Sequence, residues 1–381
     1  MKNGWQKKTL GELIQLISGQ HIEAKDYNTE SRGMAYLTGP SDFGEINPII
    51  SKWTELPKVK AKRGDILITV KGSGVGKINL LDEPEVAISR QLMAIRVTGA
   101  DPGFIYLFLS STFDHFQSES TGAAIPGISR DQVLGLRTAI PPLPEQQRIV
   151  AILDEAFDGI ATAKANAEKN LQSARELFDR EIQACFERGG ESWVMVRLDE
   201  VTNLSRGHNP PKSKFSYEAK PGYVRFYQIR DGGSDDYAVY VPDTPQLHKM
   251  NKDDIMMVAY RHVGRAFRGV EGAFNVALCK ISNANRNRLH DDYLYHIIPS
   301  RFIKGELLKR SERSLIPSMS IEHLKELEIP LPPISVQHRI VESIHRLQTE
   351  TQRLESIYQQ RLTALDELKQ SLLHHAFNGD L

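Results

Sequence analysis

The chain is a tandem repeat, and no other feature of the sequence constrains its fold as strongly. Residues 125–129 (IPGIS) recur as residues 316–320 (IPSMS), at an offset of 191 positions. The same offset relates Phe186 to Phe377 near the ends of two long polar segments. A register that holds over so long a stretch predicts two copies of one structural plan.

The beginnings of the two copies match more loosely. Residues 64–67 (GDIL) match residues 253–256 (DDIM) at an offset of 189, and Asp42 matches Asp231 at the same offset. Between such matches the copies diverge. We therefore expect two related but different globular units, each followed by a similar long segment. The boundaries that follow from the repeat are 1–144, 145–187, 188–335 and 336–381.

The two long segments are predicted to be helices. After Pro144 and again after Pro333, apolar residues recur in steps of three, four and seven, which is the pattern of a helix with one apolar stripe. A helix of about 40 residues is about 60 Å long. Such a helix would expose its stripe unless it packed against a partner, so we expect the two helices to lie antiparallel as a coiled-coil-like spacer. The alternative is that they are core helices of two separate domains.

The globular units are predicted to be mixed α/β. Short apolar runs at 65–70, 86–88, 92–97 and 254–259 are typical of buried strands. Residues 104–109 (FIYLFL) are expected to form a helix that packs on the first sheet. The expected fold class is therefore α+β, with two mixed α/β domains in tandem, separated by the two long antiparallel helices.

Composition excludes several classes of protein. Hydrophobic residues make up 40% of the 381 residues and charged residues 25%, which is typical of neither a disordered nor a membrane protein. No apolar run reaches the roughly 18–20 residues that span a bilayer, and residues 1–8 lack the apolar segment of a secretory signal. The two cysteines, Cys185 and Cys279, give no indication of an oxidising compartment. We therefore expect a cytoplasmic protein.

Charge is balanced overall but unevenly distributed. The 48 basic and 48 acidic residues exclude a chain that coats polyanions through bulk charge, though not one with local basic surfaces. Residues 145–187 carry a net charge of −4, whereas residues 188–335 carry +4. The acidic first segment is thus better suited to a protein partner than to DNA.

The sequence carries no catalytic signature. Residues 72–77 (GSGVGK) follow an expected strand, yet they lack the spacing of a Walker phosphate loop and of GxGxxG. Residues 209–212 (NPPK) resemble the Asn-Pro-Pro-aromatic motif of amino-methyltransferases, but Lys212 stands in the aromatic position and favours a simple turn. The histidines and cysteines have no zinc spacing. We expect neither a catalytic residue nor a metal site.

Two sets of polar and aromatic side chains surround corresponding loops in the two copies. Arginine and lysine pair with guanine edges or phosphates, glutamine pairs with adenine, and aromatic rings stack. Loops that differ between otherwise parallel copies are suited to reading different DNA sequences, while the alternative of solvated charged loops without function stays open. The candidate DNA-contacting residues are Thr69, Lys71, Ser73, Lys77, Arg90 and Gln91 in the first copy, and Arg206, Arg225, Gln228, Arg230, Tyr260, Arg261, His262, Arg265 and Arg268 in the second.

Two proline-containing segments and the end of the chain carry a resemblance to a known family. They are residues 140–150 (IPPLPEQQRIV), their second version at 329–334 and 337–341, and residues 377–381 (FNGDL). With the two-copy arrangement, these segments resemble the specificity subunit (S, HsdS) of type I restriction–modification systems. One departure lies at residues 335–336, where Ser-Val replaces the Pro-Glu of the first copy.

The resemblance implies a division of labour between subunits. In that family two target recognition domains each read one half of a split DNA sequence in the major groove, and the antiparallel helices fix the gap between the halves. The subunit is not catalytic and holds no cofactor. It docks two methyltransferase (M) subunits that use AdoMet, and endonuclease/translocase (R) subunits that use ATP and Mg join them. The implied partner-binding positions are Pro142, Glu145, Arg148, Pro333 and Arg339.

Two other functions remain compatible with the residues alone. A non-catalytic coiled-coil adaptor would use the paired helices to link proteins, without DNA specificity. A methyltransferase with a degenerate motif would bind AdoMet as an isolated chain. Sequence-specific retention of DNA at moderate salt distinguishes the specificity subunit from the adaptor.

Overall fold

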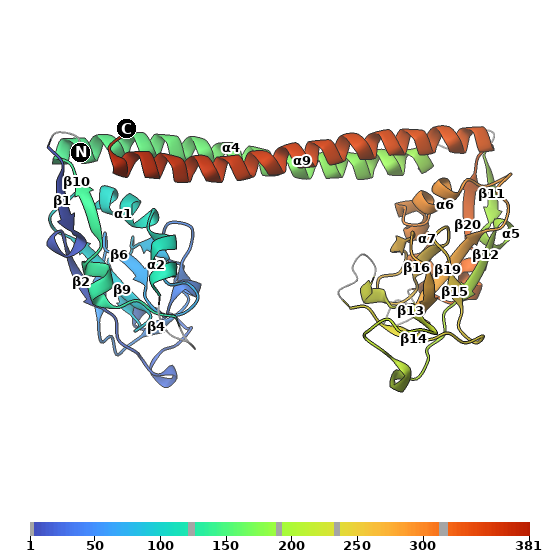
Figure 1. Ribbon diagram of the computed structural model, residues 1–381, viewed down its shortest axis with the longest axis horizontal. Helices are drawn as coiled ribbons and strands as arrows, with labels where there is room; N and C mark the ends of the chain where they lie inside the picture. The colour runs from blue at the N-terminus through green and yellow to red at the C-terminus, as the bar shows by residue number, and fades with distance from the viewer. Residues whose placement is uncertain (1–3, 121–125, 188–192, 232–236, 312–318) are drawn as a thin grey trace. The chain divides into compact units, whose positions relative to one another are not determined.

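The computed structural model of the chain divides into two compact units (Figure 1). Unit 1 comprises Met1–Glu168 and Gln359–Leu381, and unit 2 comprises Lys169–Tyr358. Each unit therefore combines one globular part with a stretch of both long helices. The residues that the structure describes are 4–120, 126–187, 193–231, 237–311 and 319–381.

Unit 1 contains three small β-sheets. Two four-stranded sheets have the strand orders β2-β9-β6-β7 and β4-β3-β8-β5, and β1 pairs with β10. Neighbouring strands are antiparallel except β3 and β8, which are parallel. The strands are β1 (Gln6–Thr9), β2 (Ile14–Ser18), β3 (Met34–Leu37), β4 (Trp53–Thr54), β5 (Lys60–Lys62), β6 (Ile66–Thr69), β7 (Ile78–Leu80), β8 (Glu85–Ile88), β9 (Leu92–Val97) and β10 (Arg137–Ile140).

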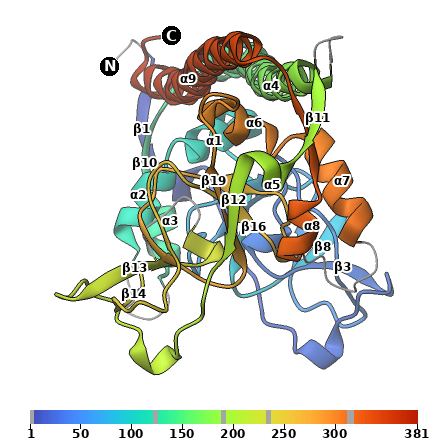
Figure 2. The same cartoon turned by 90° about the vertical axis from the view of Figure 1, so that its right-hand side faces the viewer.

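Unit 2 repeats this topology strand by strand (Figure 2). Its sheets have the orders β12-β19-β16-β17, β14-β13-β18-β15 and β11-β20, and its one parallel pair among the described strands is β13 with β18. The internal repeat of the sequence is therefore a repeat of topology. The strands are β11 (Val194–Arg197), β12 (Thr202–Arg206), β13 (Tyr223–Tyr227), β14 (Tyr240–Pro242), β15 (Lys249–Met250), β16 (Ile255–Val258), β17 (Ala266–Phe267), β18 (Gly272–Phe274), β19 (Leu278–Asn283) and β20 (Glu328–Leu331).

The central strand of each unit is buried on both faces, which explains its continuous apolar run. In β6, Ile66 and Ile68 belong to the core that contains Phe104 of α1, whereas Leu67 packs with Leu37 of the second sheet. Alternate residues of a strand point to opposite faces, so a strand covered on both sides needs apolar residues at every position. All four residues of β6 and all four of β16 are buried.

Short helices cover the sheets, and two long helices complete the units. Asp101 is the N-cap of helix α1. Its side chain accepts a hydrogen bond from the main-chain N–H of Phe104 (3.1 Å), as is typical of an N-cap. The α-helices are α1 (Pro102–Ser110), α2 (Phe113–Glu119), α3 (Arg130–Leu134), α4 (Leu143–Glu187), α5 (Leu198–Val201), α6 (Asp291–Ile297), α7 (Arg301–Ser311), α8 (Ile321–Lys325) and α9 (Ile334–Asn378). The 3₁₀ helices are η1 (Leu10–Glu12), η2 (Ala24–Asp26), η3 (Pro40–Asp42), η4 (Lys212–Lys214) and η5 (Ile229–Asp231).

Helices α4 and α9 run antiparallel in both units. Each contains 45 residues, which corresponds to about 68 Å. In unit 1, Lys164 of α4 forms an ion pair with Asp366 of α9 (2.7 Å), and in unit 2, Arg175 forms one with Glu355 (2.6 Å). Residue numbers along α9 therefore fall as those along α4 rise. The predicted antiparallel helices are confirmed. Among the described residues, no helix is long and apolar enough to cross a membrane.

The repeated phenylalanines anchor the long helices to the globular parts. In unit 1, the ring of Phe377 contacts Phe104 and Phe108 of α1, at centroid distances of 5.2 and 5.5 Å. In unit 2, Phe186 contacts Tyr293 of α6, at 5.6 Å. The end of each long helix thus inserts one aromatic ring beside a short helix, α1 in unit 1 and α6 in unit 2, which explains why this residue recurs at an offset of 191.

A buried glutamine links the start of each long helix to the globular part. In unit 1, Oε1 of Gln146 accepts a hydrogen bond from the main-chain N–H of Asp101 (2.7 Å), and its Nε2 donates to the carbonyl of Pro141 (2.8 Å). Gln146 is only 3% exposed. The side chain therefore ties the N-cap of α1 to the turn that precedes α4.

Gln337 makes the same link in unit 2 and is fully buried. Its Oε1 accepts from the main-chain N–H of His290 (2.8 Å), the N-cap of α6. Its Nε2 donates to the carbonyls of Pro332 and Arg288, both at 2.8 Å. Three main-chain groups in unit 2 thus depend on one side chain.

The α+β fold expected from the sequence is confirmed. The strand predicted at 92–97 coincides with β9, and the helix predicted at 104–109 lies inside α1. The division of the chain at 144, 187 and 335 stays a prediction. Of the repeated motif that revealed the two copies, Ile125 and residues 316–318 lie outside the described residues.

Candidate nucleic-acid interface

Two adjacent turns in unit 1 bring most of the predicted side chains of the first copy together. We call residues 69–77, between β6 and β7, and residues 89–91, between β8 and β9, the first loop cluster. The main-chain N–H of Thr69 donates to the carbonyl of Lys77 (2.8 Å), which closes the first turn. The N–H of Val70 donates to the carbonyl of Gln91 (2.8 Å), which joins the two turns.

Unit 2 contains the same arrangement, which we call the second loop cluster (residues 258–265 and 275–277). The main-chain N–H of Val258 donates to the carbonyl of Arg265 (2.8 Å), and that of Ala259 donates to Ala277 (2.9 Å). The first turn is one residue shorter than in unit 1. Its hydrogen-bonded closure is nevertheless the same.

Side chains and glycines support the same framework in both clusters. Oγ of Ser89 accepts from the N–H two positions ahead (3.1 Å), and Oδ1 of Asn275 does so at 3.2 Å. Such turns are typical of Ser and Asn. Gly76 and Gly264 close the first turns with φ of +84° and +86°, a region that favours glycine. The two clusters therefore have one backbone design and different side chains.

The exposed side chains of the two clusters differ in chemistry. The first presents cations and amides, whereas the second combines cations with an aromatic ring and a histidine. Val276, which is 44% exposed, occupies the position of Arg90 in the second cluster and was not predicted from the sequence. An apolar side chain there is suited to the methyl group of thymine. Exposed predicted residues are Lys71, Ser73, Lys77, Arg90, Gln91, Arg261, His262 and Arg265, and Tyr260 is half-buried.

Thr69 differs from the other predicted DNA contacts of the first copy. Its side chain is fully buried at the end of β6. It lies inside the run at 65–70 that the sequence predicts to be a buried strand. Thr69 supports the loop through its main chain and does not present a side chain to DNA.

Arg225 also supports the fold rather than the surface. It lies in β13, where its guanidinium is 3.6 Å from the carboxylate of Asp231 and 4.5 Å from the ring centroid of Tyr227. Only 10% of its side chain is exposed. Unit 1 balances the matching carboxylate, Asp42, with Lys52 (3.6 Å). A DNA contact for Arg225 stays a prediction, and in this structure its side chain is engaged within the fold.

Arg206 is engaged beneath the second loop cluster. Its guanidinium donates to the carbonyl of Met319, and its own carbonyl accepts from His248. It lies beside Cys279, whose pKa is raised to about 12 by burial, so that this thiol stays protonated. Arg206 thus braces the chain below the loops, and its role as a DNA contact stays a prediction.

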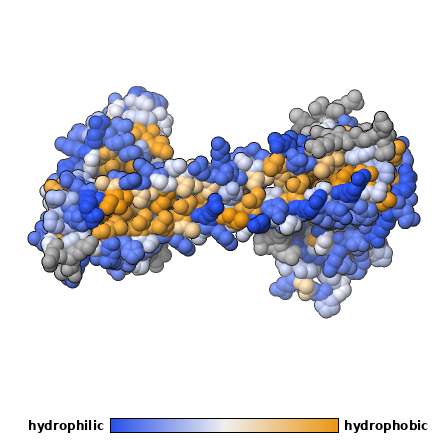
Figure 3. Space-filling model, turned by 90° about the horizontal axis from the view of Figure 1, so that it is seen from above, coloured by the Kyte–Doolittle hydropathy of each residue, from blue (hydrophilic) through white to orange (hydrophobic). Residues whose placement is uncertain are grey.

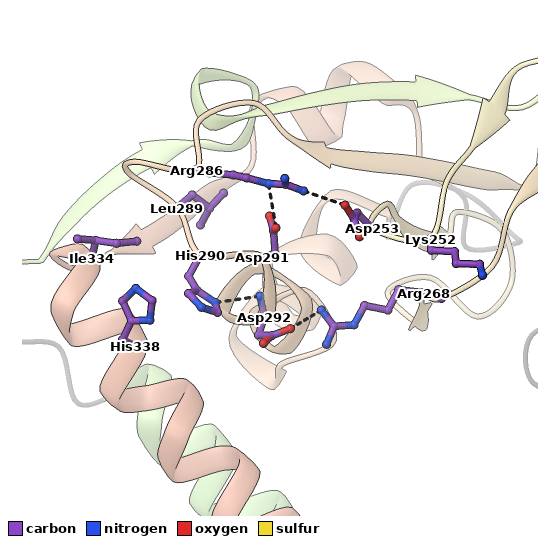
Figure 4. Close-up of a pocket in the computed structure, with 11 residues that line it drawn as sticks. Lys252, Asp253, Arg268, Arg286, Leu289, His290, Asp291, Asp292, Ile334 and His338 are labelled. Atoms are coloured by element: carbon purple, nitrogen blue, oxygen red, sulfur yellow. Dashed lines mark hydrogen bonds and ion pairs between the residues drawn. The ribbon is translucent and has the colours of Figure 1, made fainter.

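Arg268 lines a pocket of unit 2 whose wall contains several ion pairs (Figure 4). The guanidinium is 2.5 Å from the carboxylate of Asp292 and 4.4 Å from the ring centroid of Tyr295. Beside it, Arg286 bonds to both Asp253 and Asp291, each at 3.0 Å. Charges of both signs balance there, so Arg268 is held within the fold, and a DNA contact for it stays a prediction.

Two further predicted residues, Gln228 and Arg230, lie outside the two loop clusters. The main-chain N–H of Gln228 donates to Asp231 (2.7 Å), and its side chain is half-buried. Arg230 is exposed, with its guanidinium 5.5 Å from the ring centroid of Tyr237. Both stay predictions as DNA contacts.

His296 makes the stability of unit 2 depend on pH. Burial, then the charges of His345 and Arg268, lower its pKa to about 4. In the unfolded chain the imidazole of His296 has a pKa near 6.5, so it takes up a proton at a higher pH than in the folded chain. The neutral, buried His296 therefore contributes fully to stability above about pH 6.5, and this contribution is lost as the pH falls towards 4. After allowance for partial exposure the loss is on the order of 2 kcal/mol at pH 4.

We expect His296→Leu to remove this part of the acid sensitivity, because leucine occupies the matching position 107 in α1. The free energy of unfolding, measured between pH 4 and 7, should fall less in the variant than in the wild type. His323→Leu, at an exposed position of α8, is the control and should follow the wild type. Parallel curves for the wild type and His296→Leu would contradict the assignment.

The predicted partner-binding positions surround the starts of the long helices. Glu145 and Arg148 form an ion pair (2.7 Å), and Arg148 also donates to the carbonyl of Leu381 (2.9 Å). Pro142, Pro333 and Arg339 are exposed. Their roles as partner contacts stay predictions.

Comparison with known proteins gives a consistent result. The sequence profile described as the type I restriction modification DNA specificity domain matches residues 2–171 and 190–363. The chain is 20% identical to the type I restriction enzyme EcoDI specificity subunit of Escherichia coli, over 99% of this chain and 88% of that protein. It is 27% identical to the putative type I restriction enzyme MjaX specificity subunit of Methanocaldococcus jannaschii, over 45% of this chain and only 41% of that protein.

The fold has a counterpart among solved structures. A chain from a study described as "Structural basis underlying complex assembly and conformational transition of the type I R-M system" superposes with a TM-score of 0.80. The match covers 100% of this chain and 99% of that chain, at 20% identity. The two chains therefore share a fold that extends over both repeats.

Proposed function

This chain belongs to the type I restriction–modification DNA specificity family, and we propose that each of its units reads one half of a split, asymmetric target in double-stranded DNA. The chain is the DNA-recognition subunit of such a system and is not its catalyst. The adaptor and methyltransferase alternatives are not favoured, because the relatives are specificity subunits. A subunit that recognises DNA in this way acts in the cytoplasm.

The observation that carries the proposal is the pair of loop clusters. Their main chains are closed by the same hydrogen bonds, whereas their exposed side chains differ at almost every position. A fold that only needed to be stable would not require this difference. Two readers of different half-sites require a common frame that positions different side chains against base edges in the major groove.

Cations at matching positions of the clusters are suited to phosphates. Lys77 and Arg265 stand at the same step of the first turn and are both exposed. Contacts to phosphates carry no sequence information, so both units can use the same charge there. Each phosphate contact makes binding depend on salt, with a slope of about −0.9 on logarithmic axes.

The long helices would hold the two readers at a fixed spacing and dock the methyltransferase subunits. Figure 3 looks onto the helices, where hydrophobic residues gather along α4 and α9 between hydrophilic ones. Large apolar residues exposed on a helix are suited to a protein partner. We propose two AdoMet-dependent methyltransferase subunits on this surface, with ATP- and Mg-dependent endonuclease subunits joining them. The exposed apolar residues of these helices are Leu143, Ile152, Leu177, Leu354 and Leu368.

The test is to express the chain with its methyltransferase subunit and to map methylated adenines by long-read sequencing. We expect a split motif with a fixed spacer, which is lost when this chain is omitted. Replacing residues 1–140 with those of a relative should change one half of the motif only. A stable complex that methylates no defined motif would contradict the proposal.

A further inference from the structure

Arg261 has a main-chain conformation that disfavours its own side chain. Its φ is +64°, in the left-handed region, and among the described residues only Ser31 shares a positive φ without being glycine. The left-handed region brings the Cβ atom close to the following carbonyl and is populated mainly by glycine. Arginine at this position therefore needs an explanation outside the stability of the fold.

Unit 1 shows what the turn itself requires. The matching residue is Gly72, which has a φ of +95° at the same step of the first loop cluster. Both residues stand three positions after the end of the central strand, in turns with the same hydrogen-bonded closure. Glycine satisfies the conformation in unit 1, so the arginine of unit 2 is retained for what its side chain does.

The interactions that the described residues make do not account for that side chain. Arg225 and Arg268 each approach a carboxylate, at 3.6 and 2.5 Å. Among the described residues, Arg261 has no ion-pair partner; its guanidinium lies 5.7 Å from the ring centroid of Tyr260 and is exposed. The cation is thus displayed at the tip of the turn.

We propose that Arg261 is the residue through which unit 2 recognises a guanine in its half of the target, by donating two hydrogen bonds to O6 and N7 of that base. This inference rests on the proposed function and names the base class that one site reads. The guanidinium fork matches these two acceptors in the major groove, and the pair is the commonest specific contact between protein and DNA.

The comparison of the two turns favours a base over a phosphate. A cation is kept at the matching positions Lys77 and Arg265, as a contact needed by both units would be. Position 261 is not matched in this way, because its counterpart in unit 1, Gly72, has no side chain. A contact that one half-site needs and the other does not is a contact that carries sequence information.

The experiment uses the complex with the methyltransferase subunit and the target that its methylation map defines. The half read by unit 2, identified by exchange of residues 1–140, must contain a guanine. Arg261→Gly should lower the preference for that guanine over other bases by about 10- to 100-fold. Replacing the guanine with 7-deazaguanine, which lacks the N7 acceptor, should weaken binding by the wild type and leave the variant unchanged.

Thermal unfolding distinguishes the loss of a base contact from misfolding of the variant. Arg261→Gly relieves the left-handed conformation, so its midpoint of thermal unfolding should not fall. Ser31→Gly, the matched change in unit 1, should behave alike in stability and keep full specificity. Arg261→Lys, which keeps the charge without the rigid fork, should reduce the preference for guanine but less than Arg261→Gly does.

Three results would overturn the inference. A half-site without guanine would do so directly. If Arg261→Gly weakened binding equally on all DNA sequences, Arg261 would contact a phosphate. If the substitution left binding unchanged, Arg261 would make no contact with DNA. In each case the wild-type complex would still methylate a split motif, whereas failure of the proposed function would leave no motif to analyse.

Discussion

Replacing Gln337 with alanine is expected to lower the free energy of unfolding of unit 2 by about 3 kcal/mol. The side chain is fully buried and bonds to three main-chain groups, the N–H of His290 and the carbonyls of Pro332 and Arg288. A buried polar group that loses its partner costs about 1–3 kcal/mol. Gln337→Glu should be at least as harmful, because a carboxylate cannot donate to the two carbonyls.

Urea unfolding and hydrogen exchange at the amide of His290 measure the effect. Gln352→Ala, at an exposed position of the same helix, is the matched control and should change little. Gln146→Ala should cost less than Gln337→Ala, because the structure gives that side chain two hydrogen bonds. If Gln337→Ala and Gln352→Ala were equally mild, this glutamine would not hold α6 to the long helix.

The elements that the sequence predicted well are those with the strongest patterns. The helices α4 and α9 were visible because their apolar residues keep one stripe over 45 residues. Strands β6 and β9 were visible because they are long apolar runs in the middle of a sheet. Strands β4 and β15, at the edges, contain two residues each and carry no period that a pattern could reveal.

The candidate site was predicted in outline, but the sequence did not separate arginines engaged within the fold from exposed ones. Sequence identifies an arginine but not the carboxylate that folding brings beside it. Arg225 and Arg268 were grouped with Arg261, although aspartates at positions 231 and 292 hold the first two within the fold. Only the three-dimensional arrangement separates arginines that stabilise the unit from those that are displayed.

The role of Gln146 and Gln337 was missed for a related reason. Both residues stood in the repeated segment that revealed the family, yet a glutamine in a polar helix start looks like a surface residue. Its partners are main-chain groups, which carry no sequence signal. The offset of 191 between the two glutamines was the available clue.

Exchanging the reading turn between the units is expected to abolish recognition of the first half-site without unfolding the protein. In the graft, residues 259–265 replace residues 70–77. The hydrogen bonds that close the two turns are the same, and the graft keeps a glycine where Gly76 has a φ of +84°. Each good base contact contributes about 1–3 kcal/mol of discrimination, so the loss of two contacts lowers the preference for the first half-site by roughly 10²-fold or more.

The methylation map of the complex that carries the graft measures the outcome for both halves at once. The second half-site and the spacer should persist, because unit 2 and the long helices are unchanged. A second graft that restores lysine at the positions of Lys71 and Lys77 is the matched control. It should recover affinity that falls with salt, since lysine at any exposed site of the turn can contact phosphate.

The informative failure would be a folded graft whose first half-site is unchanged. The turn would then contribute no base contact, and reading by unit 1 would fall to Arg90 and Gln91 in the neighbouring turn. Their exposed side chains stand where unit 2 has Val276 and Ala277, so the units differ there as well. Exchange of residues 89–91 with 275–277 would then change the first half-site, because the two turns share the closure by Ser89 and Asn275.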